Sequence, residues 1–336
     1  MAKISADKIK QKAIQLGYTD CKIIPVQAFD EYRKALDERS ETFPNSKDAY
    51  AYWYNLLEPP AEGKSIIVCA LGHSKYKIPD MAKHYAKHYL FSINLPYTQE
   101  HRAKTEFETF LKINRVNILE AGVPDRWAAA KSGLGKFGRN NFIYMPQHGS
   151  NLVICTWVVD VEMDYDPIQT DTTAKECKEG CMLCVHACPT AAMDGEFSME
   201  FERCVARLSY NTDLPDTATR KQMGAWMYGC DVCQDVCPMN KDIFTEEEDY
   251  PLLTDFEEHM QLENILEMDE ETYKNIVNPR FWYMGEDALW KWKCNALRVM
   301  INSGDERYYP LIEKYCTHED ERVREVASEG WKEISG

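Results

Sequence analysis

The chain has 336 residues, of which 44% are hydrophobic and 28% are charged. This composition excludes a disordered, collagen-like or low-complexity chain, and the length suffices for two or three domains. The formal net charge is −16, so binding to nucleic acid would require a local basic patch. The N-terminus carries no secretory signal, and no apolar run approaches the ~20 residues that span a bilayer. We therefore expect a cytoplasmic protein that makes no contact with membranes.

The first 165 residues alternate between helix and strand patterns. Helices are expected over residues 6–16, 29–41 and 105–114, and strands over residues 21–26, 65–71 and 152–162. The run Ser65–Leu71 is continuously apolar, which is typical of a strand buried on both faces. Residues 1–165 are therefore predicted to form an α/β domain around a central sheet.

A glycine-rich stretch, DRWAAAKSGLGKFGRNN, begins at Asp125. It contains the G-x-G-x-x-G of dinucleotide-binding loops, but that pattern must follow a strand and open a helix. Here Asp125–Lys131 is itself a helix-forming run, and Gly133 fits the residue just after a helix end. We favour a loop that a large flat ligand approaches closely; an ordinary glycine-rich connection is the alternative. The candidate ligand-binding residues are Arg126, Gly133, Gly135, Lys136, Gly138, Arg139, Asn140 and Asn141.

Eight of the thirteen cysteines lie between residues 177 and 237. Each half of this segment ends in C-x2-C-x3-C-P, the spacing of bacterial ferredoxins with two clusters, in which the cysteine before proline binds the neighbouring cluster. Zinc is the alternative, because C-x2-C pairs also bind zinc, but zinc sites seldom carry the x3-C-P tail. We predict two 4Fe-4S clusters, one held by Cys177, Cys181, Cys184 and Cys237 and the other by Cys188, Cys204, Cys230 and Cys233. The other five cysteines are expected to be buried as small hydrophobic side chains.

Two features depart from a simple ferredoxin. The first cysteine gap has three residues instead of two, and 25 residues separate Cys204 from Cys230. An insertion of this length suggests a cluster module, over residues 166–245, that is built into a larger enzyme. Residues 246–336 end in three helical patterns, over residues 288–302, 308–316 and 321–334, whose arrangement is similar to a HEAT-type repeat.

Taken in this order, the parts resemble bacterial epoxyqueuosine reductases, a family related to the corrinoid reductive dehalogenases. The resemblance is carried by the eight cysteines, the glycine-rich stretch, and the segments GSNLVICTWVVD and GCDVCQDVCPMN. It implies an α+β fold with an α/β cobalamin-binding domain of nitroreductase-like type, a ferredoxin-like double-cluster module and C-terminal HEAT-like helices. It also implies base-off cobalamin, electrons from an external low-potential donor through the two clusters to cobalt, and a modified tRNA base as substrate.

Several residues differ from the family pattern. The family has an Asp-Thr pair shortly before its Glu-Arg, and that Asp is its expected proton donor. Here Leu119 or Glu120 stands where the Asp-Thr pair should be, so Glu120 takes its place with a shift of one residue, and Asp125-Arg126 replaces Glu-Arg. Glu120 is therefore our candidate catalytic acid, and a surface carboxylate is its alternative role.

The substrate is left open by the sequence. The basic residues that precede the HEAT-like helices in the family are replaced by NPRFWYMGEDALWKWK, and the chain is acidic, so a small molecule is an alternative to tRNA. A reductive dehalogenase-like enzyme is a second possibility for a small substrate. A different class also remains, an iron–sulfur electron carrier or corrinoid reductase with no substrate of its own.

Overall fold

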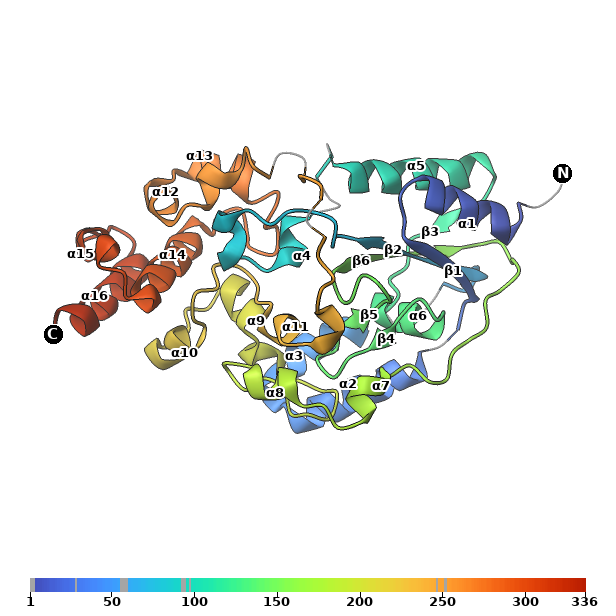
Figure 1. The fold of residues 1–336 in the computed structure, drawn as a ribbon, viewed down its shortest axis with the longest axis horizontal. Helices are drawn as coiled ribbons and strands as arrows, with labels where there is room; N and C mark the ends of the chain where they lie inside the picture. The colour runs from blue at the N-terminus through green and yellow to red at the C-terminus, as the bar shows by residue number, and fades with distance from the viewer. Residues whose placement is uncertain are drawn as a thin grey trace.

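A four-stranded antiparallel sheet, in the order β1-β2-β6-β3, lies at the centre of the N-terminal part of the chain (Figure 1). Its strands are β1 (Asp20–Pro25), β2 (Ser65–Gly72), β3 (Ile118–Leu119) and β6 (Leu152–Val159). All residues of β2 except Gly72 are buried, as its continuous apolar sequence predicts. The computed structural model describes residues 4–27, 29–54, 60–91, 95–96, 98–245, 247–250 and 253–336.

Helices cover both faces of this sheet. On one face lie α1 (Ala6–Gln15) and α5 (Gln99–Ile113), and on the other lie α2 (Asp30–Thr42), α3 (Lys47–Trp53) and α6 (Asp125–Lys131). The predicted elements are found within a few residues, except that α5 starts six residues before Thr105. The reason is local, because the Thr98 side chain accepts a hydrogen bond from the His101 N–H and caps the helix there.

Three buried cysteines lie in a row across the sheet. Cys21 on β1 is opposite Cys69 on β2, and Cys69 is opposite Cys155 on β6. All three thiols are buried, and Cys294 is buried as well, which confirms for these four the expectation of small hydrophobic side chains; Cys316 is only half-buried.

The glycine-rich stretch follows a helix and opens a hairpin. Gly133 comes directly after the end of α6 with φ +76°, the left-handed conformation expected of a residue after a helix end. The strands β4 (Lys136–Phe137) and β5 (Ile143–Tyr144) then pair with each other. This order of helix and strand is the reverse of a dinucleotide-binding loop, which excludes that alternative.

Short helices joined by loops make up the cysteine-rich module, drawn in yellow-green to orange in Figure 1. They are α7 (Lys175–Lys178), α8 (Leu183–Ala187), α9 (Val205–Tyr210), α10 (Thr217–Gln222) and α11 (Val232–Asp235). The insertion between Cys204 and Cys230 contains α9 and α10, and α10 reaches toward the C-terminal helices.

The C-terminal helices gather around the largest hydrophobic core. They are α12 (Leu262–Glu267), α13 (Glu270–Thr272), α14 (Leu289–Ser303), α15 (Tyr309–Tyr315) and α16 (Glu321–Ser335). The turn at Gly304 and the two helices after it lie where the sequence predicts them. The segment around α4 (Lys87–Leu90) packs into the same core, where the ring of Tyr85 stacks on that of Phe281. The HEAT-like relationship and the domain boundaries stay predictions.

Within the described ranges, none of the helices is long and apolar enough to cross a membrane.

Close packing of α14 on α16 gives one stability prediction. A Cβ atom added at Gly330 would lie 2.1 Å from Cδ1 of Ile301. We expect Gly330→Ala to lower the free energy of unfolding by about 1–3 kcal/mol because the added methyl overpacks the contact. Helix propensity alone predicts the opposite sign, a gain of about 1 kcal/mol. Urea unfolding followed by circular dichroism decides between them, with Glu325→Ala on the exposed face of α16 as the control.

Candidate functional site

The structure places the eight clustered cysteines in two groups. The first thiol group, which is Cys177, Cys181, Cys184 and Cys237, lines a single cavity. The second thiol group is Cys188, Cys204, Cys230 and Cys233, whose thiolate charges act on one another. These are the two sets that the crossed ferredoxin spacing predicts, and each contains thiols from both halves of the module.

Burial and neighbouring thiols raise the pKa of Cys177 and of Cys184, which favours their neutral form when no metal is bound. The pKa of Cys184 is raised to about 11, first by burial and then by the neighbouring Cys177 and Cys237. Iron would reverse this, because a coordinated thiol is deprotonated by the charge of the metal. The backbone N–H of Arg139 points at Cys177 Sγ from 3.3 Å, as a donor to a thiolate should.

Backbone N–H groups also lie close to thiols of the second group. The N–H of Ala192 lies 3.3 Å from Cys188 Sγ. Backbone N–H groups of Ala206 and Val232, at the starts of α9 and α11, lower the pKa of Cys204 and of Cys230, although burial raises both values overall. N–H groups at helix starts favour negative charge on sulfur.

The arrangement fits clusters better than single ions. Among the described residues, no three His, Cys, Asp or Glu side chains converge closely enough to hold one metal ion. Four thiols around a cavity instead leave room for a group with several metal atoms. Cys233 of the second group lies within electrostatic reach of Cys184 of the first, so two clusters held here would be neighbours.

The loop over residues 133–141 anchors the cysteine-rich module. Arg139 donates hydrogen bonds to the carbonyl groups of Cys177 and Cys181, at 2.7 and 2.9 Å. Asn140 donates to the carbonyl of Cys233 at 3.0 Å. Sequence reasoning assigned these side chains to a flat ligand and missed that they join the two parts of the chain.

The glycines of this loop have a packing explanation. A Cβ atom at Gly135 would lie 2.4 Å from Cγ2 of Ile143, and one at Gly138 would lie 2.4 Å from Cε2 of Tyr144. The exposed Lys136 pairs with Asp171 at 3.2 Å. Contact of this loop with a corrin stays a prediction.

A group of mostly exposed side chains lies where the sheet, α4 and the C-terminal segment meet, and we refer to this group below as the recess. We define it by Asp125, Arg126, His88, Tyr89 and Tyr283. Water reaches these side chains, yet the surrounding protein shifts the pKa of several of them. Arg126 lies within electrostatic reach of His88 and Tyr283, and the rings of Tyr89 and Tyr283 lie 5.8 Å apart.

The surroundings shift the pKa of two groups in the recess in the direction that favours their neutral forms. Desolvation lowers the pKa of His88 to about 4, helped by the positive charge of Arg126. Desolvation also raises the pKa of Asp125, against the opposing effects of Arg126 and of Thr156, whose hydroxyl donates to Asp125 Oδ1 at 2.6 Å. A carboxyl group with a raised pKa can donate a proton nearer neutral pH than an ordinary aspartate.

The second thiol group adjoins this recess. The charge of Arg126 acts on Cys204, and that of Cys204 acts on Tyr89 and Tyr210. The ring of Tyr210 stacks on that of Tyr283 at 5.1 Å, and Trp282 stacks on Tyr283 at 4.1 Å. About half of the surface of Trp282 and of Tyr283 is exposed, so an aromatic pair is open to a planar ligand.

A cavity of about 640 Å³ lies between α3 and the segment around α9. Its walls are mostly polar and include Asn45, Asp48, Arg207 and Asn211. A pocket of this size and polarity suits a ligand of substantial size with many hydrogen-bonding groups.

The candidate acid Glu120 is exposed and follows directly after β3. β3 ends at Leu119, opposite Val158, so Glu120 lies near the part of β6 that carries Thr156. Sequence reasoning missed Asp125 and His88 as recess groups, because no local pattern shows that α4 and α6 meet. For the C-terminal segment, the aromatic run Phe281-Trp282-Tyr283 was the sequence feature that could have indicated a contribution to the recess.

The grouping of the cysteines predicts which pairs of substitutions act on the same cluster. We expect Cys177→Ala/Cys237→Ala to keep about four of about eight irons per chain, because both residues belong to the first thiol group. Cys177→Ala/Cys230→Ala should lose nearly all iron, because it removes one ligand from each group. Iron content and visible absorbance after anaerobic reconstitution measure this. If the ligand sets were uncrossed, with Cys188 in the first set and Cys237 in the second, the first double variant would lose all iron.

Comparison with known proteins gives three findings. Residues 176–240, which contain all eight clustered cysteines, match the family described as "4Fe-4S double cluster binding domain". The chain is 28% identical to the epoxyqueuosine reductase of Cellulophaga algicola, over 81% of this chain and 89% of that one. It is also 28% identical to the epoxyqueuosine reductase of Listeria monocytogenes, over 80% of this chain and 72% of that one.

The same fold is found in a solved structure of epoxyqueuosine reductase with an epoxyqueuosine-modified tRNA-Tyr stem loop. The match has a TM-score of 0.72, covers 98% of this chain and 90% of that chain, and has 19% sequence identity. At this identity the likeness shows the fold alone. From the sequence similarity together with the double-cluster match, the chain is an oxidoreductase that resembles the epoxyqueuosine reductases over most of its length, as a divergent relative.

Proposed function

We propose that this chain is a cobalamin- and iron–sulfur-dependent reductase of the epoxyqueuosine reductase type. The observation that carries the proposal is the pair of adjacent thiol groups, the second of which borders the recess. A chain that only carried electrons would have no need of a desolvated carboxyl group beside an arginine in such a recess.

The residues of the recess suit a corrin. Its side chains carry many amide groups, which need hydrogen-bond donors and acceptors. Among the described residues, the buried Asn141 Nδ2 has no hydrogen-bond partner, and Arg126 lies beside it, donating to the Asn141 carbonyl at 3.1 Å. Arg126 and Asn141 would hold the group. When bound, cobalamin supplies a cobalt that reduction turns into a strong nucleophile or one-electron donor.

The placement of the thiol groups supports one direction of electron flow. An external low-potential donor would deliver electrons to the first group, where the half-exposed Leu183 lies beside Cys184 in the lining of the cavity. Cys184 and Cys233 bring the two groups together, and Cys204 borders the recess. Electrons therefore pass from the first cluster to the second and then to the recess.

Asp125 is the proton donor favoured by the geometry. Removing an epoxide oxygen as water takes two electrons and two protons, so the site needs an acid that is protonated near neutral pH. Desolvation raises the pKa of Asp125, and the hydrogen bond from Thr156 fixes its orientation. Glu120, which occupies the position nearest the family's acid, is the second candidate.

The substrate is a planar, polar molecule or group. The relatives are named for epoxyqueuosine, and one solved relative holds a modified tRNA stem loop. In this chain, the exposed aromatic pair Trp282 and Tyr283 suits stacking of such a ring. A small molecule, including a halogenated one, is the second candidate for the substrate. The net charge of −16 argues for it and against a tRNA.

Cofactor and substrate are tested together. Anaerobically reconstituted chain should bind cobalamin, with a change in the corrin absorbance bands, and should reduce an epoxyqueuosine-containing stem loop. Binding of the stem loop should weaken steeply with salt, since phosphate contacts release counterions. Clusters without any cobalamin binding would leave only the electron-carrier alternative. Cobalamin binding without reduction of the stem loop would favour a small substrate.

The role of Asp125 predicts a pH effect. The acid must be protonated, and desolvation raises its pKa, so turnover should be highest below this raised pKa and fall as pH rises through it. Asp125→Asn should lower kcat about 10²–10⁴-fold and remove this fall. Glu120→Gln is the matched control and should keep the profile. The reverse result, with the loss in Glu120→Gln only, would transfer the role to Glu120.

A further inference from the structure

Four polar side chains form one stripe along α14. They are Lys291, Asn295, Arg298 and Asn302, at spacings of four, three and four residues, which place them on one face of the helix. Lys291, Asn295 and Arg298 are only 1–3% exposed. Because lysine and arginine are almost never buried without partners, this face must meet hydrogen-bond acceptors.

The acceptors are backbone carbonyl groups of the insertion between Cys204 and Cys230. Lys291 donates to the carbonyl of Asp213 at 2.5 Å, Arg298 to that of Gly224 at 2.8 Å and to that of Trp226, and Asn302 to those of Arg220 and Gly224, both at 2.9 Å. These hydrogen bonds therefore depend on the backbone conformation of the insertion and little on the identity of its side chains.

Asn295 joins the two arms of the insertion. Its Nδ2 donates to the carbonyl of Ser209 at 2.7 Å and to that of Met227 at 3.1 Å. Ser209 lies five residues after Cys204, and Met227 lies three residues before Cys230. The Ser209 hydroxyl also accepts a hydrogen bond from the Gly229 N–H at 2.9 Å. One side chain of α14 thus connects the arm that leaves one cysteine with the arm that returns to the other.

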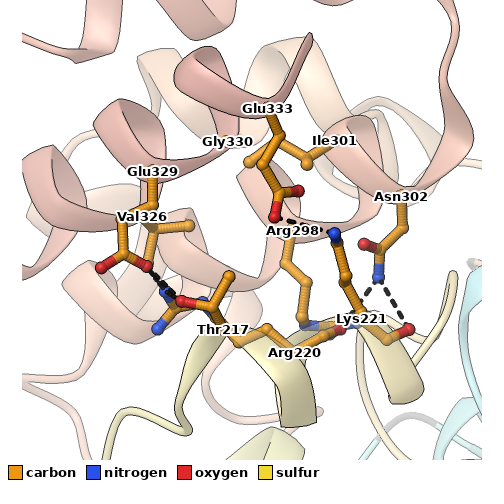
Figure 2. A pocket seen from close by; sticks show the side chains of 10 residues that line it. All are labelled: Thr217, Arg220, Lys221, Arg298, Ile301, Asn302, Val326, Glu329, Gly330 and Glu333. Atoms are coloured by element: carbon orange, nitrogen blue, oxygen red, sulfur yellow. Dashed lines mark hydrogen bonds and ion pairs between the residues drawn. The ribbon is translucent and has the colours of Figure 1, made fainter. Parts of the chain in front are cut away.

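Helix α16 holds the insertion from a second side, as Figure 2 shows. Lys221 of α10 pairs with Glu333 at 2.8 Å, and Arg220 pairs with Glu329. Thr217 also donates to Glu329. In the same view, Arg298 and Asn302 reach α10 and the turn after it from α14.

Burial of two cations in this stripe is costly. Burial lowers the pKa of Lys291 to about 8 and that of Arg298 to about 9. An apolar face on α14 would have stabilised the helix packing without this cost. The stripe therefore contributes something besides stability of the C-terminal helices, and the acceptors named above all belong to the insertion.

We propose that Asn295 and Arg298 are positioning residues for the second cluster. They fix the separation of Cys204 and Cys230, so the C-terminal helices control how firmly that cluster is held and its reduction potential. The inference rests on the proposed function in one respect, the presence of an iron–sulfur cluster in the second thiol group.

The test compares the two clusters within one chain. Full-length Asn295→Leu, which removes both donors at similar volume, is reconstituted anaerobically beside the unsubstituted chain. We expect iron of the second cluster to be released to a chelator about tenfold faster and its midpoint potential to shift in an EPR titration, with the first cluster unchanged. Cys204→Ala and Cys177→Ala chains, each left with one cluster, assign the signals. Asn295→Gln keeps the amide donor, so its rate of iron release and the midpoint potential of its second cluster should lie closer to those of the unsubstituted chain.

Matched variants separate positioning from a general loss of structure. Lys293→Met removes a lysine of α14 whose charge faces Glu267 and Glu319 instead of the insertion, and it should change neither cluster. If Asn295→Leu does not fold, Arg298→Lys, which keeps the charge but not the paired donors, gives the same comparison. The proposal would be overturned if the substitution accelerated iron release equally from both clusters. It would also be overturned if neither cluster changed in iron release or midpoint potential. An unsubstituted chain that forms no second cluster would overturn the proposed function as well.

Discussion

The structure depends on bringing together thiols that are far apart in the sequence. Each of the two thiol groups takes members from both halves of the module, so neither half can complete a group alone. Burial, and after it the charges of neighbouring thiols, raises the pKa of Cys184, so the convergence of these thiols must be maintained by the rest of the chain. Arg139 and Asn140 do this from the sheet side, and α14 does so from the C-terminal side.

Much of the fold could be predicted because it follows from local patterns. The continuous apolar run of β2, the glycine after α6 and the turn at Gly304 are each determined by residues close in sequence. The grouping of the cysteines followed from a spacing that reflects how two clusters share ligands. The start of α5 was missed because one capping side chain, Thr98, extended the helix beyond its apolar pattern.

The recess could not be predicted, because its walls come from three distant segments. Asp125, His88 and Tyr283 carry no common motif, and only the folded chain brings His88 and Tyr283 within electrostatic reach of Arg126, the sequence neighbour of Asp125. The polar stripe of α14 was hidden for another reason. Lysine, asparagine and arginine on a helix ordinarily indicate a face in water, and here that face is buried against backbone carbonyl groups.

The crossed membership of the thiol groups has a consequence for biosynthesis. The first group remains one ligand short until Cys237 has left the ribosome, and the arms that carry Cys204 and Cys230 are not joined until α14 follows. Iron–sulfur insertion must therefore wait for nearly the whole polypeptide.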